Sequence, residues 1–280
     1  MIVIKVGGGA GNQIENLCDD IAKWIGAGRQ VVLIHGGSHL TNELSTQLGH
    51  PPRFITSPSG FTSRYTDRRT MEIFQMAYCG QANKAIVECL QKRGVNAIGL
   101  SGMDGRLWEG SRKTSVRAVE NGKTIVIRDN YTGVIEQVNQ GLLRTLIDQG
   151  FVPVITPPGI SREGDPINVD GDRAAAATAI AMQAEHLVIL SNVAGLLRDV
   201  ADPASLVAHL SRNELDAAID QYAEGRMRIK LLAAGEAIDG GVRTVTIGDS
   251  RLENCLSQAL NGTGTVISTS AITVSDTSDA

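Results

Sequence analysis

Glycine closes two short apolar runs near the N-terminus, and the first run carries a lysine. Residues 2–6 (IVIKV) lead into residues 7–9 (GGG), and residues 31–34 (VVLI) lead into residues 35–37 (HGG). Each run is typical of a buried strand, and glycine at its end leaves backbone N–H groups that a phosphate oxygen can approach. One such turn alone is equally typical of an ordinary strand-to-helix connection, but the pair with Lys5 indicates an anion-binding site.

Three later segments also carry candidate ligands. Asp170 and Asp172 open an alanine-rich helical pattern, where a carboxylate either caps the helix or meets a ligand, and for Asp170 we favour the cap. Residues 225–230 (GRMRIK) place three cations in the first part of a predicted helix, against its dipole, which a bound anion explains better than solvent exposure. Residues 191–196 (SNVAGL) follow a buried run and are typical of a ligand loop or a turn.

Two common phosphate-binding motifs do not fit this sequence. Gly7, Gly9 and Asn12 give G-x-G-x-x-N, without the third glycine of a dinucleotide-binding turn. His35 stands where an acidic ribose ligand is expected, and the Walker A pattern does not occur. Phosphate binding must therefore use a different arrangement.

The composition favours a globular protein that handles small ligands. The chain has 280 residues, 42% of them hydrophobic, and can bury a sizeable core. A net charge of −4 and 4% aromatic residues argue against a nucleic-acid partner. The four cysteines lack the spacing of a zinc site or a disulfide framework. No apolar stretch reaches the ~20 residues of a membrane span, and a strand from residue 2 leaves no room for a signal peptide, so we expect a cytoplasmic protein with no membrane partner.

Strand and helix patterns alternate, which predicts an α/β fold, a three-layer αβα sandwich around a mostly parallel sheet. Helices are expected at residues 14–25, 41–48, 67–93, 139–149, 174–184 and 228–239. Strands are expected at residues 2–6, 31–34, 95–100, 151–155, 187–190 and 242–247, with a last edge strand at 266–267 and a hairpin within 106–135 around Asn121-Gly122. We expect an N-terminal lobe over residues 1–170, a C-terminal lobe over 171–268 and a disordered tail over 269–280.

The motifs together resemble those of the amino acid kinase superfamily, and within it the acetylglutamate kinase group. The resemblance runs from Lys5 to about Ile267. Six motifs occur in the family's order: KVGG (5–8), HGG (35–37), SRYTD (63–67), INVDGD (167–172), SNVAG (191–195) and GRMRIK (225–230). The resemblance implies an N-terminal lobe for substrate binding and dimerisation and a C-terminal lobe for ATP.

Residue roles follow from the same resemblance. Lys5 and Lys230 would neutralise the transferring phosphoryl group, and Asp172 would hold the two lysines in position. The substrate would contact Gly36, Gly37, Ser38, Arg64 and Asn168, with Arg64 on its α-carboxylate. ATP, with Mg²⁺, would contact Lys5, Gly7, Gly8, Ser191, Asn192, Val193, Gly195, Leu196, Met227 and Lys230; no resident metal site is expected.

Phosphoryl transfer to a carboxylate suits this set of residues. A carboxylate with a pKa of about 4.3 is already ionised at neutral pH, so its attack needs no general base. It needs relief of the repulsion between two anions, which lysines, backbone amides and Mg²⁺ supply. His35 is the tempting acid or base, but inside the HGG motif we favour a structural hydrogen-bonding role.

Departures from the arginine-pathway pattern point to the acceptor. Ser38 replaces a third glycine, and the segments 63–66 (SRYT), 78–80 (YCG) and 100–105 (LSGMDG) look most like kinases acting on aminoadipate attached to an amino-group carrier protein in lysine biosynthesis. An ω-acyl phosphate beside a free α-amine would cyclise, so the amine must be masked by an acetyl group or by the carrier. Carrier-linked glutamate, N-acetylglutamate in arginine biosynthesis, a phosphate acceptor such as isopentenyl phosphate, and a non-catalytic sensor are the alternatives.

The resemblance also implies partners. A small acidic carrier protein would need a basic rim on this acidic chain. Candidates for the rim are Arg53, Arg64, Arg68, Arg69, Arg112, Lys113, Arg117, Lys123 and Arg128. Family members without an N-terminal extension helix are usually dimers, so by analogy we expect a homodimer with little arginine feedback.

Overall fold

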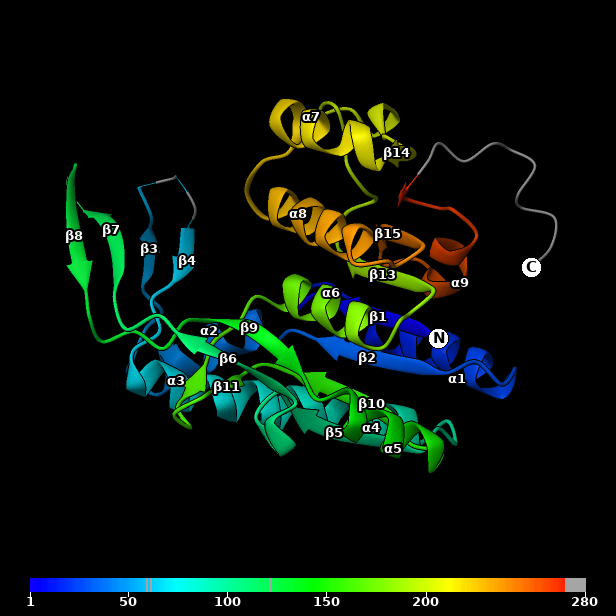
Figure 1. Ribbon diagram of the computed structural model, residues 1–280, viewed down its shortest axis with the longest axis horizontal. Helices are drawn as coiled ribbons and strands as arrows, with labels where there is room; N and C mark the ends of the chain where they lie inside the picture. The colour runs from blue at the N-terminus through cyan, green and yellow to red at the C-terminus, as the bar shows by residue number, and fades with distance from the viewer. Residues whose placement is uncertain (59, 61, 121, 270–280) are drawn as a thin grey trace. The chain divides into compact units, whose positions relative to one another are not determined.

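The computed structural model describes residues 1–58, 60, 62–120 and 122–269 (Figure 1). Most of the tail expected over 269–280 therefore lies outside the described residues. The chain divides into two compact units: unit 1 comprises Met1–Gly7, Gly11–Val32 and Ala175–Ala280, and unit 2 comprises Gly8–Ala10 and Leu33–Ala174. The N-terminal strand and first helix thus group with the C-terminal part of the chain, whereas the expected lobes were consecutive; the roles assigned to the lobes stay predictions.

Eight strands form the main sheet, in the order β14-β16-β15-β13-β1-β2-β10-β5. Parallel pairs join β1 with β13, β13 with β15, β2 with β10, β10 with β5, and β14 with β16. The pair of β15 and β16 is antiparallel. The expected α/β class with a mostly parallel sheet is confirmed.

Unit 1 holds most of the strands of the main sheet. Its elements are β1 (Ile2–Val6), α1 (Ile14–Gly26), β13 (His186–Ser191), a 3₁₀ turn (Pro203–Ser205), β14 (His209–Ser211), α7 (Arg212–Tyr222), α8 (Gly225–Asp239), β15 (Thr244–Asp249), α9 (Cys255–Leu260) and β16 (Thr265–Ser268). Every residue of β1 is buried, as a strand between two neighbours in a parallel sheet requires. The buried carboxylate of Asp20 in α1 accepts hydrogen bonds from the backbone and hydroxyl of Ser257, which fixes α9 on α1.

The strand expected at residues 266–267 is confirmed as β16, but its predicted position at the edge of the sheet is wrong, because β14 pairs with β16 on the side away from β15. Strand β14 and helices α7 and α9 were not predicted from the sequence. Strand β14 and helix α9 are too short for periodicity to reveal. Helix α7 carried a signal, because Ser211 and Glu214 form a capping box at its start.

Unit 2 contains the rest of the main sheet and three smaller sheets. Strand β2 (Val31–His35) and helix α6 (Gly171–Ala181) each have residues in both units. The other elements are α2 (Ser38–Gln47), β3 (Phe54–Thr56), β4 (Thr62–Arg64), α3 (Arg68–Gln75), a π-helix (Met76–Ala82), α4 (Asn83–Gln91), β5 (Ala97–Ser101), a 3₁₀ turn (Asp104–Arg106), β6 (Trp108–Arg112), β7 (Val116–Glu120), β8 (Lys123–Ile127), β9 (Gly133–Val138), α5 (Gln140–Asp148), β10 (Val152–Thr156), β11 (Gly159–Ser161) and β12 (Pro166–Ile167). The smaller sheets are β12-β11-β6-β9, β3-β4 and β7-β8.

The expected hairpin around residues 121 and 122 is confirmed as β7-β8, although Asn121 itself lies outside the described residues. The β7-β8 hairpin is inserted between β6 and β9, because these two flanking strands pair with each other. Strand β3 packs beside β7 in unit 2, so the two hairpins stand together (Figure 1).

The helix expected over residues 67–93 is interrupted by the π-helix, which includes the YCG segment. A π turn inserts one residue without changing the apolar pattern enough to be seen in sequence. Within this turn, Tyr78 stacks on Phe74 with ring centroids 3.8 Å apart. A Cβ atom on Gly37 would lie 2.9 Å from the Tyr78 ring, so the aromatic ring packs directly against the glycine loop after β2.

Candidate active site

Three parallel strands of unit 1 end at the same edge of the sheet. Val6 lies opposite Leu190, and Ser191 lies opposite Asp249, so the segments that follow β1, β13 and β15 leave the sheet together. The carboxyl ends of parallel strands are where open α/β sheets bind ligands. This edge brings together three of the predicted positions in unit 1: Lys5, Gly7 and Ser191.

Asn12 and Ser250, which were not predicted as site residues, hold this edge together. Asn12 Nδ2 donates to the Gly7 carbonyl at 2.6 Å, and Ser250 Oγ lies 2.7 Å from Asn12 Oδ1. The backbone N–H of Ser250 donates to the Ser191 carbonyl at 2.7 Å. The glycine turn and the 191–196 loop are therefore linked through two polar side chains. Only the last residue of the G-x-G-x-x-N pattern hinted at Asn12.

The 191–196 loop has an anchored end and an open end. Gly195 has φ +153°, and a Cβ there would lie 2.5 Å from Thr265 Oγ1. Leu196 is buried and its N–H donates to the same Thr265 hydroxyl at 2.8 Å, so its described contacts are structural. At the open end Asn192 and Val193 are exposed. Ser191 is 7% exposed, and among the described residues its Oγ has no hydrogen-bond partner.

Lys5 on β1 and Lys230 on α8 are both buried, each with 7% exposure. A buried ammonium group is retained only where anions or polar groups compensate its lost hydration. The sequence predicted that a bound anion accounts for all three cations of residues 225–230. This prediction is wrong for Arg228, which forms an ion pair with Asp220 of α7 at 2.9 Å. Met227 is half-buried in the first turn of α8.

In unit 2 the backbone of Gly8 lies directly against the loop after β2. A Cβ on Gly8 would be 2.1 Å from the Gly37 nitrogen, 2.5 Å from the Gly36 carbonyl carbon and 2.7 Å from the Ser38 nitrogen. The Gly8 carbonyl accepts hydrogen bonds from the His39 N–H at 2.9 Å and from Ser38 Oγ at 3.1 Å. The two glycine loops thus form one backbone surface that excludes any side chain at residue 8.

His35 is fully buried and has a structural role, as expected. Its Nδ1 lies 2.9 Å from the Gly36 carbonyl, to which it must donate. Its Nε2 lies 3.1 Å from Asn83 Nδ2, which also donates to the Val154 carbonyl at 2.9 Å. This network assigns a neutral imidazole with both nitrogens engaged.

The predicted substrate residues of unit 2 come together. Arg64, at the end of β4, donates from Nη2 to the Ser38 carbonyl at 3.3 Å and lies over the Phe54 ring at 5.3 Å. Asn168 Nδ2 donates to the hydroxyl of Thr66, two residues after Arg64, at 3.0 Å. The guanidinium group that would bind a carboxylate is therefore anchored on the last residue of the glycine loop.

Asp170 and Asp172, at the start of α6, have different roles in the structure. Asp170 Oδ1 accepts from the N–H groups of Asp172 and Arg173, each at 3.0 Å, so the predicted cap at Asp170 is confirmed. Asp172 is buried, with 6% exposure, in the first turn of α6. Its predicted role of positioning Lys5 and Lys230 stays a prediction.

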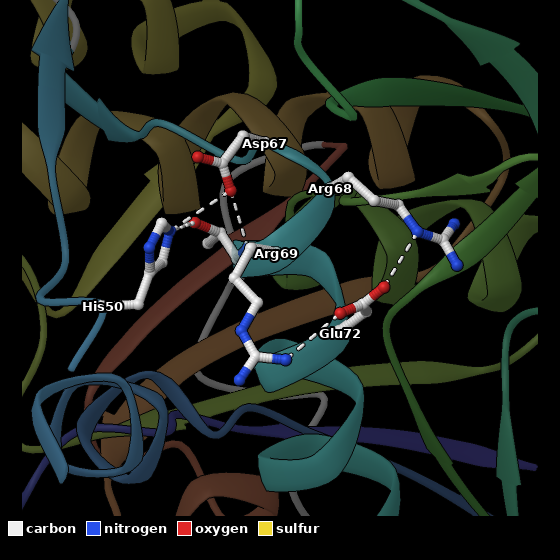
Figure 2. Close-up of polar contacts among 6 residues, drawn as sticks. His50, Asp67, Arg68, Arg69 and Glu72 are labelled. Carbon is white, nitrogen blue, oxygen red and sulfur yellow. Dashed lines mark hydrogen bonds and ion pairs between the residues drawn. The ribbon is translucent and has the colours of Figure 1, made fainter. Parts of the chain in front are cut away.

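Asp67 ends the SRYTD motif and caps α3. Figure 2 shows its carboxylate between His50 and the first turn of the helix, where it accepts from the Thr70 N–H at 2.7 Å and lies 3.3 Å from His50 Nε2. Partial burial pushes its pKa up, but the hydrogen bonds from Thr70 and the charge of His50 outweigh this and hold the pKa of Asp67 below its ordinary value.

Most of the basic residues proposed as a rim already have partners. Arg68 and Arg69 both pair with Glu72, each at 3.3 Å (Figure 2), and Arg53 pairs with Glu120. Arg112 is 19% exposed, pairs with Asp165 at 2.9 Å and lies 3.7 Å from the Tyr131 ring. The residues that are exposed and have no ion-pair partner in the described part of the chain are Lys113, Arg117, Lys123 and Arg128.

Comparison with known proteins identifies the family of this chain. Residues 1–249 match the model of the amino acid kinase family, and the chain belongs to that family. It is 54% identical over 268 residues to the [LysW]-aminoadipate kinase of Deinococcus radiodurans, covering 96% of this chain and 91% of the relative. It is 51% identical to the protein of that name from Thermus thermophilus, covering 95% and 100%. The [LysW]-aminoadipate/[LysW]-glutamate kinase of Metallosphaera sedula is 37% identical, covering 96% and 100%.

Solved structures share the fold. N-acetylglutamate synthase from Neisseria gonorrhoeae, complexed with coenzyme A and N-acetyl-glutamate, matches with a TM-score of 0.77 and 27% identity over 97% of this chain. The chain spans 60% of the length of that protein. Carbamate kinase from Giardia lamblia bound to AMP-PNP matches with a TM-score of 0.67 and 19% identity, covering 95% of this chain and 98% of the other.

The glycine contact predicts different outcomes for neighbouring alanine substitutions. Gly8→Ala should lower the free energy of unfolding by about 1–3 kcal/mol, because its Cβ overlaps backbone atoms that cannot rotate away. The His39 amide should then exchange faster with deuterium, since its acceptor is the Gly8 carbonyl. Gly9→Ala is the matched control, because a Cβ there meets nothing within 4 Å. Equal stability and exchange in the two variants would contradict the close approach.

The Asp67 cap predicts a pH-dependent contribution to stability. Asp67→Ala should cost about 1 kcal/mol at neutral pH, and Asp67→Asn, which keeps a capping oxygen, should cost less. Because the pKa of Asp67 is lowered by folding, its charge stabilises the fold above the ordinary value of 3.8, and this part is lost as pH falls through the folded pKa. Denaturant titrations at several pH values should show the wild type and Asp67→Ala converging in acid; a constant difference would argue against the assignment.

Proposed function

We propose that the chain transfers the γ-phosphoryl group of ATP to the side-chain carboxylate of L-2-aminoadipate whose α-amine is linked to the LysW carrier protein. The observation that carries this proposal is the hydrogen bond from Arg64 to the Ser38 carbonyl, which attaches to the glycine loop the guanidinium group that would bind the substrate's α-carboxylate. The relatives at 54% and 51% identity, both named [LysW]-aminoadipate kinase, support the choice of acceptor.

The acceptor half of the reaction is assigned to unit 2. Backbone N–H groups of Gly8, Gly36 and Gly37 would stabilise charge on the transferring phosphoryl group, because glycine has no side chain of its own that would keep a phosphate oxygen from the backbone. Arg64 would pair with the α-carboxylate in a charge-assisted bond. Since the attacking carboxylate is ionised at neutral pH, its oxygen attacks the γ-phosphorus directly, a C–O–P linkage forms, the bond to the β-phosphate oxygen breaks, and ADP leaves.

ATP binding is assigned to unit 1. Ser191, Asn192, Val193 and Gly195 would line the nucleotide, and Met227 would contact it from α8. The buried ammonium groups of Lys5 and Lys230 would neutralise the phosphates. Among the described residues no cluster of three or more His, Cys, Asp and Glu side chains is arranged to hold a metal ion. Mg²⁺ commonly binds mainly through substrate phosphates, so we propose that it arrives with ATP.

The docking face for the carrier is assigned to the β7-β8 hairpin. Arg117 of β7 lies opposite Val126 of β8, so their side chains share one face of the hairpin. Alternation of side chains along each strand places Val119, Thr124 and Arg128 on that same face. Arg117 and Arg128 are exposed there with apolar surface between them, Val126 being 53% exposed. An acidic carrier would be steered to such a face by charge. Arg112 is withdrawn from the proposed rim because its guanidinium group is already bound to Asp165.

Location and assembly complete the proposal. No helix in the described part of the chain is long and apolar enough to cross a membrane. We propose the cytoplasm as the site of action because the reaction consumes ATP, and the homodimer expected from the family resemblance stays a prediction.

A side-by-side substrate comparison tests the proposed reaction. ADP release should be fastest with LysW-linked aminoadipate, slower with N-acetylaminoadipate and slowest with N-acetylglutamate. LysW-linked glutamate belongs in the series, because the Metallosphaera sedula relative is named for both acceptors. Preference for N-acetylglutamate would favour an arginine-pathway kinase, and nucleotide binding without ADP release from any acceptor would favour a non-catalytic sensor.

Charge reversal tests the docking face. The double variant Arg117→Glu, Arg128→Glu should raise the KM for LysW-linked aminoadipate about tenfold at low salt, with the KM for ATP unchanged, because only encounter with the carrier depends on the hairpin. Arg144→Glu reverses an exposed charge on α5 and is the matched control. The effect should shrink as salt rises. An unchanged KM for the carrier-linked substrate would exclude the hairpin as the docking face.

A further inference from the structure

Thr66 lies between the two residues assigned to the amino-acid part of the substrate, and its side chain contacts both segments. The residue is fully buried in unit 2. Its hydroxyl donates to the Arg64 carbonyl at 3.2 Å and accepts from Asn168 Nδ2 at 3.0 Å. One hydroxyl group therefore joins the end of β4 to the segment that precedes α6.

The direction of these two hydrogen bonds determines the orientation of the Asn168 amide. A hydroxyl has one proton, and Thr66 gives it to a carbonyl oxygen, which can only accept. Thr66 Oγ1 can then only accept from Asn168, so the amide must turn its NH₂ toward Thr66 and its oxygen Oδ1 away. Without the hydroxyl, the two ends of the amide would be nearly equivalent in shape.

The backbone around Thr66 is also tied to the same neighbours. The Thr66 carbonyl accepts from the Tyr131 N–H at 2.8 Å, and the Asn168 N–H donates to the Tyr131 carbonyl at 2.6 Å. The peptide groups of Tyr131 thus hold the two segments in register, independently of the Thr66 side chain. Loss of the hydroxyl alone should leave this backbone arrangement in place.

We propose that Thr66 is a positioning residue for the acyl amino acid: its hydroxyl fixes the backbone that carries Arg64 and sets Asn168 to present its amide oxygen. This inference rests on the proposed function. The masked α-amine of the substrate is an amide with a single N–H, which is a donor and needs an acceptor. Asn168 Oδ1 supplies that acceptor only in the orientation that Thr66 imposes.

Three variants separate this role from a general contribution to folding. Thr66→Val keeps the shape and removes the hydroxyl, and it should raise the KM for LysW-linked aminoadipate about tenfold while kcat and the KM for ATP stay within twofold. Thr66→Ser restores the hydroxyl and should stay within twofold of the wild type. Thr70→Val is the matched control, because it removes a buried hydroxyl whose partners are His50 and Asp67, both outside the proposed substrate contacts.

Double substitution provides the sharper test of the link to Asn168. In an Asn168→Ala background, Thr66→Val should add less than threefold to the KM, because the amide that it orients is gone. Full additivity, a Thr66→Ser variant as impaired as Thr66→Val, or a Thr66→Val effect shared equally by ATP would each overturn the proposal.

Titration calorimetry measures the dissociation constant of LysW-linked aminoadipate independently of turnover. If the wild type binds LysW-linked aminoadipate without forming ADP, the proposed reaction is wrong. A dissociation constant that is tenfold larger in Thr66→Val, but not in Thr66→Ser or Thr70→Val, still supports the positioning role. An unchanged dissociation constant overturns it. A wild type that binds no acyl amino acid overturns both.

Discussion

The contact between the backbone of Gly8 and the loop at residues 36–38 is the constraint on which the proposed acceptor site depends. A hypothetical Cβ at Gly8 would overlap the Gly37 nitrogen at 2.1 Å, so the close approach exists only because both segments lack side chains there. The Gly8 carbonyl then takes the N–H of His39 and the hydroxyl of Ser38. Because the Ser38 carbonyl in turn accepts a hydrogen bond from Arg64, the glycine contact fixes the position of the group that we propose binds the substrate carboxylate.

Buried polar side chains keep this arrangement in one conformation. His35, at the end of β2, is held by Asn83 directly before the glycine loop. Thr66 links Arg64 to Asn168. A buried hydrogen bond contributes modestly when made, but an unpaired buried group costs ~1–3 kcal/mol. Alternative arrangements of these loops are therefore disfavoured more strongly than the number of bonds suggests. The same principle applies in unit 1, where Asn12 and Ser250 link the strand ends.

The sequence was informative where glycine, charge and strand patterns coincide. The strand at residues 2–6, the Asp170 cap and the structural role of His35 could be predicted because each depends on local chemistry. The partners of Arg112 and Arg228 could not be predicted, because Asp165 and Asp220 become neighbours only through tertiary packing. The π turn around Tyr78 escaped for a different reason, since it preserves the helical apolar pattern. Thr66 was present in a recognised motif, but its role depends on a residue about a hundred positions away.

The proposed reaction is tested most directly by locating the phosphoryl group that it installs. LysW carrying aminoadipate would be incubated with the protein and MgATP, then with hydroxylamine, which converts an acyl phosphate into a stable hydroxamate. Tandem mass spectrometry of the carrier should find the hydroxamate on the side-chain carboxylate of aminoadipate, in equal amount to the ADP formed. ADP formation with no hydroxamate, or a hydroxamate on another carboxylate of the carrier, would contradict the account.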